Sequence, residues 1–480
     1  MSAGVQCCCS QDSVVQFTEL TKSLRVDDPR RHLEDLEADI IRVEKLLAQL
    51  VRKRVPLKRK INACFSPVLQ LPVEVTSEIF TACFPANACE VWGSKTPLDL
   101  GKVCSAWRDV AWSVPLLWNT VSLSTLHCSS IHAEILDEWL SRSGQLPLSI
   151  HLKFSFNRKD SSAVNGIHPP PMLRVMDVVS RASTRLHDVD ICIPGFLCDR
   201  LSSTFRAAPL LHDVKLRGFH PKTVILPVGQ LTRLQLSPTT FEECLDVLGA
   251  SPQLTHCTFE EILCSDVVNP SPVLAPRLES LEVTSTTHTA LSELLDNLLI
   301  PAARELAFHV TGNTFPDWSF TSLIARSSCT LHRLSLSGIR TSERVLWGCL
   351  EVVPSLVHLN ISNVECVTNN TIAVLNPTRD IRCRDCVPLL PNLQFLEYSG
   401  DLLQLDLGGI ADMLEARWRR GTPTTIFEDG APPIRMAQLL SVQFDTRTFD
   451  GRDLDARRRL RELFEEGMKI VISCDDVLSA

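Results

Sequence analysis

Residues 331–336 read Leu-His-Arg-Leu-Ser-Leu, and this Leu-x-x-Leu-x-Leu pattern decides how most of the chain is expected to fold. Versions of it start at residues 186, 211, 231, 254, 278, 303, 331, 356 and 393. Successive starts are 20 to 28 residues apart, except for one interval of 37. A pattern that recurs at intervals of this size, although irregularly, indicates structural repeats, each stacked on the next.

The side chains at offsets +3 and +5 from each start should share one face of a strand, because successive side chains of a strand alternate between its faces. All eighteen are apolar or weakly polar: Val189, Ile191, Val214, Leu216, Leu234, Leu236, Cys257, Phe259, Leu281, Val283, Leu306, Phe308, Leu334, Leu336, Leu359, Ile361, Leu396 and Tyr398. Full burial of one such side chain is worth roughly 1.5–3 kcal/mol. A single unit cannot bury this face alone, so the units are expected to stack.

Between these strands the spacing of apolar residues becomes helical. Leu291, Leu294, Leu295 and Leu298 are one example. A strand, a helix and a returning strand make a right-handed parallel repeat. The pattern is similar to that of leucine-rich repeats, although the Asn or Cys that usually follows the third Leu is missing. We therefore expect an α/β, leucine-rich-repeat-like solenoid over residues 123–480.

The pattern is weakest at the two ends of this range, residues 123–185 and 399–480. Strands are still expected at Leu148–Leu152, Leu440–Phe444 and Met468–Ile472, with a capping helix at Arg457–Glu466.

Offsets +2 and +4 are expected on the opposite, concave face, which is the usual binding surface of a solenoid. These positions hold Asp188, Asp190, Asp213, Lys215, Arg233, Gln235, His256, Thr258, Ser280, Glu282, Glu305, Ala307, Arg333, Ser335, His358, Asn360, Phe395 and Glu397. Their mixed, mildly acidic character suits a protein ligand better than a phosphate backbone. For any single residue of this face, a solvated side chain without a ligand is the better interpretation.

Residues 65–122 have a different pattern. Leu71-Pro72 suits a helix start, because proline lacks an N–H that would be unpaired there anyway. Val75, Ile79 and Phe80 then lie on one helical stripe, and Val103, Trp107, Val110 and Ala111 make a second. So small a helical unit makes a poor core by itself, and large apolar residues of this kind dominate protein interfaces.

This segment resembles the F-box, through Leu-Pro-x-Glu-x-x-x-x-Ile-Phe at its start and Val-Cys-x-x-Trp-Arg-x-Val-Ala at its centre. The heptad helix before it and the Pro-Leu-Leu-Trp ending look like fungal F-box-like proteins. The resemblance implies a three-helix module that docks on the Skp adaptor of a Skp–cullin–F-box ubiquitin ligase. It assigns partner binding to Leu71, Pro72, Val75, Ile79, Phe80, Val103, Trp107 and Val110. The polar insert at residues 84–99 departs from the family, and a helical cap on the repeat array is the alternative.

Residues 30–62 are expected to form a coiled-coil-like helix after a disordered tail at 1–29. Leu33, Leu36, Ile40, Val43, Leu47 and Leu50 alternate at spacings of three and four, as the seam of a coiled coil does. Pro56 marks an expected stop or kink. The helix either dimerises through residues 33–50 or packs on its own protein. The basic run at residues 52–60 suits the C-terminal end of a helix, because the helix dipole is negative there. Nuclear import or nucleic-acid binding is the alternative.

Composition restricts the functional classes. Lys and Arg number 48, Asp and Glu number 56, and the net charge of −8 argues against a protein that binds nucleic acid through its phosphates. No apolar run approaches the length of a membrane span. The 19 scattered Cys indicate reduced thiols in the cytoplasm or nucleus. Cys383 and Cys386 form a lone C-x-x-C without a second pair, so no metal and no cofactor are expected.

Together with these exclusions, the F-box resemblance implies a non-catalytic substrate-recognition adaptor in the ubiquitin conjugation pathway. Its partners would be a Skp-type adaptor, a cullin ligase and an unknown target protein. Two alternatives stay open. One is a protein-binding scaffold without ligase association, and the other is an enzyme hidden in residues 123–185 or 399–480.

Overall fold

The computed structural model describes residues 29–65, 67–84, 96–125, 129–154, 170–193, 197–218, 221–264, 271–311, 314–364, 366–377, 389–400, 406–419, 436–446 and 453–474. The chain forms two compact units. One, the helical unit, contains residues 1–83 and 97–113, and the other, the solenoid, contains residues 84–96 and 114–480.

The helical unit consists of α2 (Pro29–Phe65), the short 3-10 turn η1 (Pro67–Gln70), α3 (Val73–Cys83), α4 (Pro97–Val103) and α5 (Ser105–Ser113). Of the stop or kink expected at Pro56, the stop does not occur, because α2 continues through this residue. Proline removes one hydrogen bond to the carbonyl four residues earlier. On a helix as exposed as α2, water can satisfy that carbonyl, so the local loss does not end the helix.

Helices α3, α4 and α5 share a small core. Leu100, Phe80 and Ala111 are buried, one from each helix. The Arg108 guanidinium donates two hydrogen bonds to the carbonyl of Gly101, from Nε at 2.9 Å and from Nη2 at 2.7 Å. These bonds join α5 to α4.

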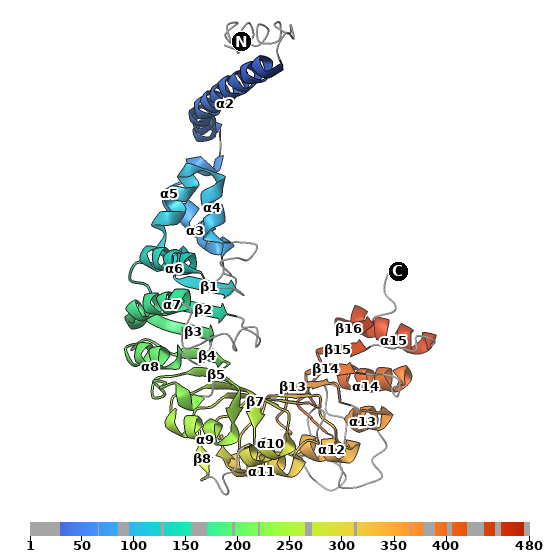
Figure 1. The fold of residues 1–480 in the computed structure, drawn as a ribbon. Helices are drawn as coiled ribbons and strands as arrows, with labels where there is room; N and C mark the ends of the chain where they lie inside the picture. The colour runs from blue at the N-terminus through green and yellow to red at the C-terminus, as the bar shows by residue number, and fades with distance from the viewer. Residues whose placement is uncertain are drawn as a thin grey trace, which may run out of the picture. The chain divides into compact units, whose positions relative to one another are not determined.

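The solenoid is built on one parallel sheet (Figure 1). Its strands lie in the order β1, β2, β3, β4, β5, β7, β9, β11, β12, β13, β14, β15, β16, with β6 paired to β7. Their bounds are β1 (Thr120–Thr125), β2 (Leu148–Phe154), β3 (Leu186–Cys192), β4 (Asp213–Arg217), β5 (Arg233–Ser237), β6 (Thr239–Thr240), β7 (His256–Leu263), β9 (Ser280–Ser285), β11 (Glu305–Val310), β12 (Arg333–Ser337), β13 (His358–Ser362), β14 (Phe395–Gly400), β15 (Ser441–Thr446) and β16 (Lys469–Cys474). A separate pair joins β8 (Val273–Leu274) to β10 (Leu298–Leu299).

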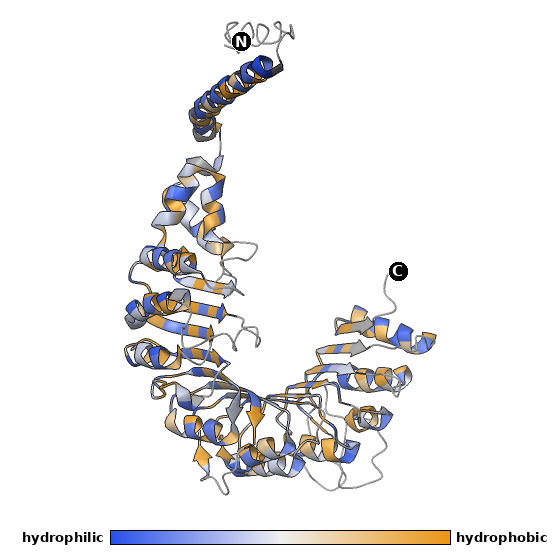
Figure 2. Ribbon diagram, in the orientation of Figure 1, coloured by the Kyte–Doolittle hydropathy of each residue, from blue (hydrophilic) through white to orange (hydrophobic). Residues whose placement is uncertain are grey.

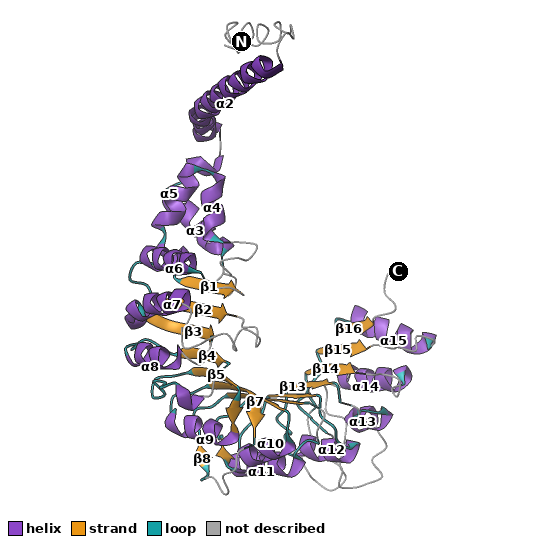
Figure 3. Ribbon diagram, viewed as in Figure 1, coloured by secondary structure: helices purple, strands orange, loops and turns teal. Residues whose placement is uncertain are grey.

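The helices of the solenoid lie along one side of this sheet (Figure 3). They are α6 (Ser130–Arg142), α7 (Pro170–Arg181), α8 (Cys198–Arg206), α9 (Phe241–Ala250), α10 (His288–Asp296), α11 (Asp317–Ser327), α12 (Glu343–Glu351), α13 (Asn369–Leu375), α14 (Leu407–Arg419) and α15 (Leu454–Glu465). Parallel neighbours with a helix between them are the α/β solenoid that the sequence predicts.

The predicted repeat core is confirmed. All eighteen side chains at offsets +3 and +5 are buried, and each of the nine Leu-x-x-Leu-x-Leu patterns coincides with a strand of the sheet. Hydrophobic and hydrophilic colours alternate along the strands in Figure 2. One boundary differs: β1 starts at Thr120, inside the range assigned to the F-box-like segment, because Val121 and Leu123 are buried beside strand β2.

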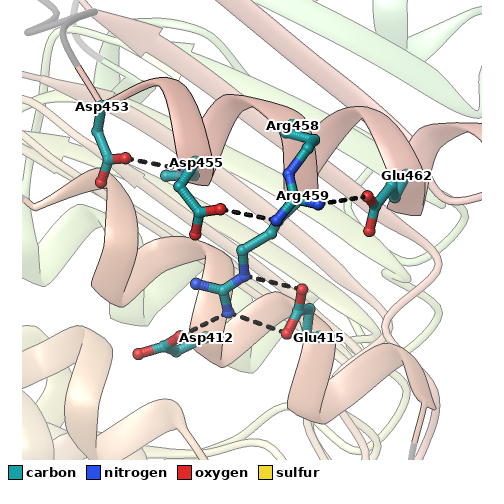
Figure 4. A network of polar contacts seen from close by, with 8 residues as sticks. Asp412, Glu415, Asp453, Asp455, Arg458, Arg459 and Glu462 are labelled. Carbon is teal, nitrogen blue, oxygen red and sulfur yellow. Dashed lines mark hydrogen bonds and ion pairs between the residues drawn. The ribbon is translucent and has the colours of Figure 1, made fainter.

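The C-terminal repeat is held by ion pairs between two helices (Figure 4). Arg459 of α15 lies 2.6 Å from Asp412 and 2.9 Å from Glu415, both on α14. The hydrogen bonds from Arg459 lower the pKa of Glu415, and the two carboxylates raise the pKa of Arg459. Asp453 caps α15 by accepting a 3.0 Å hydrogen bond from the amide of Ala456. The last helix is thereby fixed to the previous repeat.

Candidate functional site

Helix α3 has an inner and an outer stripe. Thr76 and Phe80, four residues apart, are buried. Val75 and Ile79, also four residues apart, are 41 % and 44 % exposed. Residues at this spacing lie one above the other on a helix. The outer stripe is therefore apolar, although the helical unit has already formed a core with the inner one.

One predicted docking residue, Phe80, belongs to the core and not to the surface. It is 1 % exposed, and its ring centroid lies 4.9 Å from that of Trp107 at an interplanar angle of 59°. The prediction that Phe80 binds a partner is therefore corrected. Helix α3 packs against α5, and this contact covers the Phe80 side chain. Trp107 and Val110 of α5 are half-buried.

The other predicted docking residues are accessible. Leu71 and Pro72, just before α3, are exposed, as is Val103 at the end of α4. Val73, the first residue of α3, is 50 % exposed and was not in the predicted set. The sequence signal that could have identified Val73 is an apolar side chain in the first turn of a helix that starts after Pro72. We call Leu71, Pro72, Val73, Val75, Ile79 and Val103 the exposed apolar set.

The solenoid has a second candidate surface, the sheet face opposite the helices. The residues predicted there are half-buried or exposed, with the single exception of Asp190. Asp190 lies 3.7 Å from Lys153 and 3.6 Å from Arg217, on the strands to either side. Burial opposes ionisation of Asp190, but the His151 imidazole, 3.9 Å away, and these two cations lower its pKa. The carboxylate is thus held charged among three basic side chains.

Beside it lies a less compensated acidic pair. Asp188 of β3 and Asp213 of β4 are register partners, and each has a buried carboxylate oxygen without a hydrogen-bond partner in the described part of the chain. Burial, and then the negative charge of Asp188, raise the pKa of Asp213. This part of the sheet face would gain from a cation or hydrogen-bond donor supplied by a bound molecule.

Further along the same face, polar side chains are bonded to one another across neighbouring strands. His358 and Asn360 of β13 lie 3.2 and 3.0 Å from Glu397 of β14. Gln235 donates a 2.5 Å hydrogen bond to Glu260. These contacts order the side chains of the sheet face and present a preformed polar surface.

The C-x-x-C motif is the sequence feature that bears on metal binding. Cys383 and Cys386 lie outside the described residues. Among those that the structure describes, no group of three or more His, Cys, Asp or Glu could hold a metal ion. None of the described helices combines the length and apolar character of a membrane span.

Comparison with known proteins gives a likeness of fold. No family model matches the chain, and no curated protein matches its sequence. Rad7 from yeast, solved in complex with Elc1, is similar at a TM-score of 0.39 and 14 % identity, over 77 % of this chain and 94 % of that one. An internalin, inlF, from Listeria monocytogenes is similar at 0.31 and 12 %, over 86 % of this chain and 100 % of that one. At these values no function is transferred from either protein.

Proposed function

We propose that the chain is a substrate-recognition adaptor of a Skp–cullin–F-box ubiquitin ligase. Residues 65–113 would dock on the Skp-type adaptor, and the sheet face of the solenoid would bind a target protein. No catalytic step is assigned to this chain. Its role would be to raise the effective concentration of the target near the ligase.

The observation that carries this proposal is the outer stripe of α3. The helical unit buries Phe80 and still leaves Val75 and Ile79 exposed on one side of the helix. An apolar stripe that the unit's own core does not use is suited to burial against a partner. The F-box resemblance assigns these same two positions to the adaptor interface.

The sheet face supports the target-binding half of the proposal. Solenoids bind proteins through extended surfaces of this kind. Asp188 and Asp213 would favour a Lys or Arg side chain of the target, because a cation would satisfy their unpartnered oxygens and relieve their mutual repulsion.

Capture by purified Skp-type adaptor tests the docking half, with the full chain as the captured protein. Ile79→Asp places a charge in the proposed interface. We expect a loss of roughly 2 kcal/mol, which is about thirtyfold in Kd. Ala38→Asp is the control. It adds the same carboxylate to an exposed residue of α2, outside the proposed docking segment. Circular dichroism checks that both variants are folded.

Absence of wild-type binding to the adaptor would overturn the ligase assignment. A target that still binds the solenoid would then indicate the alternative function, a protein-binding scaffold. Recovery of cullin and adaptor with the chain from its native cell, under proteasome inhibition, would support the ligase assignment.

A further inference from the structure

Helix α2 exposes an apolar seam along its whole length. The six residues of the predicted coiled-coil seam are 36 to 59 % exposed: Leu33, Leu36, Ile40, Val43, Leu47 and Leu50. The same alternation of three and four residues continues through Arg54 to Leu57, Ile61 and Cys64, all of them exposed. The seam therefore spans a helix of 37 residues, about 55 Å long. Arg54 is its only charged member.

The charges beside this seam are divided between the two halves of the helix. The flanking positions hold Glu37, Asp39 and Glu44 in the first half and Lys53, Lys58 and Lys60 in the second. In a two-stranded coiled coil, flanking positions of one helix meet flanking positions of the other, and their charges select orientation. Asp39 also lies 3.1 Å from Arg42 of its own helix, an exposed pair that contributes little.

A parallel pair of α2 helices would bring like charges together. Asp39 would meet Glu44 of the second copy, and Lys53 would meet Lys58 of the second copy. At the seam, Arg54 would face Arg54 of the second copy. Each of these contacts is repulsive.

An antiparallel pair removes all three conflicts. With Leu47 against Leu50 of the second copy, all ten seam positions are matched, up to Leu33 against Cys64 of the second copy. Glu37 then lies beside Lys58 of the second copy, and Asp39 beside Lys60 of the second copy. Arg54 faces Val43 of the second copy instead of another arginine.

We propose that two copies of this protein associate through an antiparallel coiled coil of α2. This pairing rests on α2 alone and does not depend on the proposed docking of residues 65–113. A dimer would carry two sheet faces in one particle. A target with two binding segments would then be held with increased avidity.

The mass of the full chain in solution tests the association, by light scattering during size-exclusion chromatography. A dimer is expected. Leu47→Asp puts a charge at the centre of the seam and should raise the dimer dissociation constant by at least about tenfold. Ala38→Asp is the matched control, because it adds the same group on the outer side of α2. A wild-type monomer at micromolar concentration overturns the proposal.

Charge exchange tests the orientation. Lys58→Glu together with Lys60→Glu should weaken an antiparallel dimer. Adding Glu37→Lys and Asp39→Lys should restore it, and this rescue separates lost pairing from lost folding. In a parallel dimer, Lys58→Glu would instead improve the contact with Lys53 of the second copy, so a tighter dimer contradicts the proposal.

A zero-length carbodiimide crosslinker provides an independent measurement. Asp39 and Lys60 of one helix are about 31 Å apart, too far to be joined within a chain. A bond between them, found by mass spectrometry in mixed isotope-labelled chains, is expected for the antiparallel dimer. Crosslinks from Asp39 or Glu37 to Lys45 alone, the one lysine in the first half of α2, would overturn it.

Discussion

Gly101 of α4 lies against the indole ring of Trp112 in α5. A Cβ atom at position 101 would stand 2.3 Å from Cη2 and 2.4 Å from Cζ3 of Trp112. The absence of a side chain therefore allows the two helices to approach, and the same residue's carbonyl accepts both bonds from Arg108.

Gly101→Ala should destabilise the helical unit. Alanine normally stabilises a helix by about 1 kcal/mol over glycine, but the indole would have to move, and overpacking costs about 1–3 kcal/mol. Hydrogen exchange should show faster opening of α4 and α5. Gly348→Ala in α12 is the control, because its Cβ would meet nothing within 4 Å. It should slow opening of α12. Equal responses at the two sites would contradict this account.

Arg417→Met should destabilise the C-terminal repeats by about 3 kcal/mol. The buried guanidinium of Arg417 donates to the carbonyls of Leu375 at 2.7 Å, Leu390 at 3.1 Å and Leu389 at 2.7 Å. Burial lowers its pKa to about 10, so it stays charged at neutral pH. Removing it takes a charged donor away from these three carbonyls, of which only that of Leu390 is shown to keep another donor, the amide of Leu393 at 3.3 Å. The loss in free energy of unfolding is measured by chemical denaturation, with proteolysis of this region as the readout.

Arg419→Met is the control for that variant. Arg419 is exposed on the same helix and lies 3.0 Å from Glu466. An exposed ion pair of this kind contributes about 0–1 kcal/mol. If both variants had the same effect, the buried hydrogen bonds of Arg417 would not be the cause.

Glu343→Gln should cost stability at neutral pH and little in acid. Oε1 of Glu343 accepts hydrogen bonds from the amide of Thr368 at 3.0 Å and from the hydroxyls of Thr368 at 2.6 Å and Thr371 at 2.8 Å. Partial burial opposes ionisation, but these bonds lower the pKa of Glu343. A lowered pKa means that the stability is present above the unfolded-state value of about 4.3 and is lost as the pH falls through the folded-state value.

The measurement is thermal unfolding of wild type and variant at pH 7 and near pH 3. The difference in melting temperature should shrink at the lower pH. Glu351→Gln, at an exposed residue at the other end of the same helix, should show no such pH dependence. A difference that stays constant with pH would mean that the charge of Glu343 does not matter.

Cys264 should be the fast-reacting thiol when compared with Cys244 and Cys257. The exposed Sγ of Cys264 lies 3.4 Å from the hydroxyl of Thr287 and 2.9 Å from that of Thr289, and these hydrogen bonds lower its pKa. Burial raises the pKa of Cys244 and Cys257. The thiolate is the reactive form. Iodoacetamide labelling followed by peptide mass spectrometry should modify Cys264 in the folded protein, and the other two only after unfolding.

Thr289→Val should slow the labelling of Cys264, since it removes the nearer hydroxyl. Labelling of buried Cys257 at the same rate as Cys264 would contradict the burial of the repeat core.

The sequence could predict the solenoid because its signals are local. Alternation at offsets +3 and +5 follows from the two faces of a strand, and the repeat interval supplies the stacking. Residues such as Leu334 and Leu336 are therefore found in the core without knowledge of their neighbours. The loosely patterned C-terminal end could also be predicted, since its strands and helix keep the same periods.

Long-range packing decided the features that the sequence could not predict. Phe80 and Ile79 are adjacent and equally apolar, yet only the approach of α5 determines that Phe80 is covered and Ile79 is not. A stop or a kink was expected at Pro56, and the helix does not stop there, because solvent exposure made the lost hydrogen bond tolerable. Arg417 shows no sequence signal of burial, since its three carbonyl partners come from segments 27 to 42 residues away. Periodicity specifies which side of an element is apolar, whereas the partner that covers it is chosen only when distant segments meet.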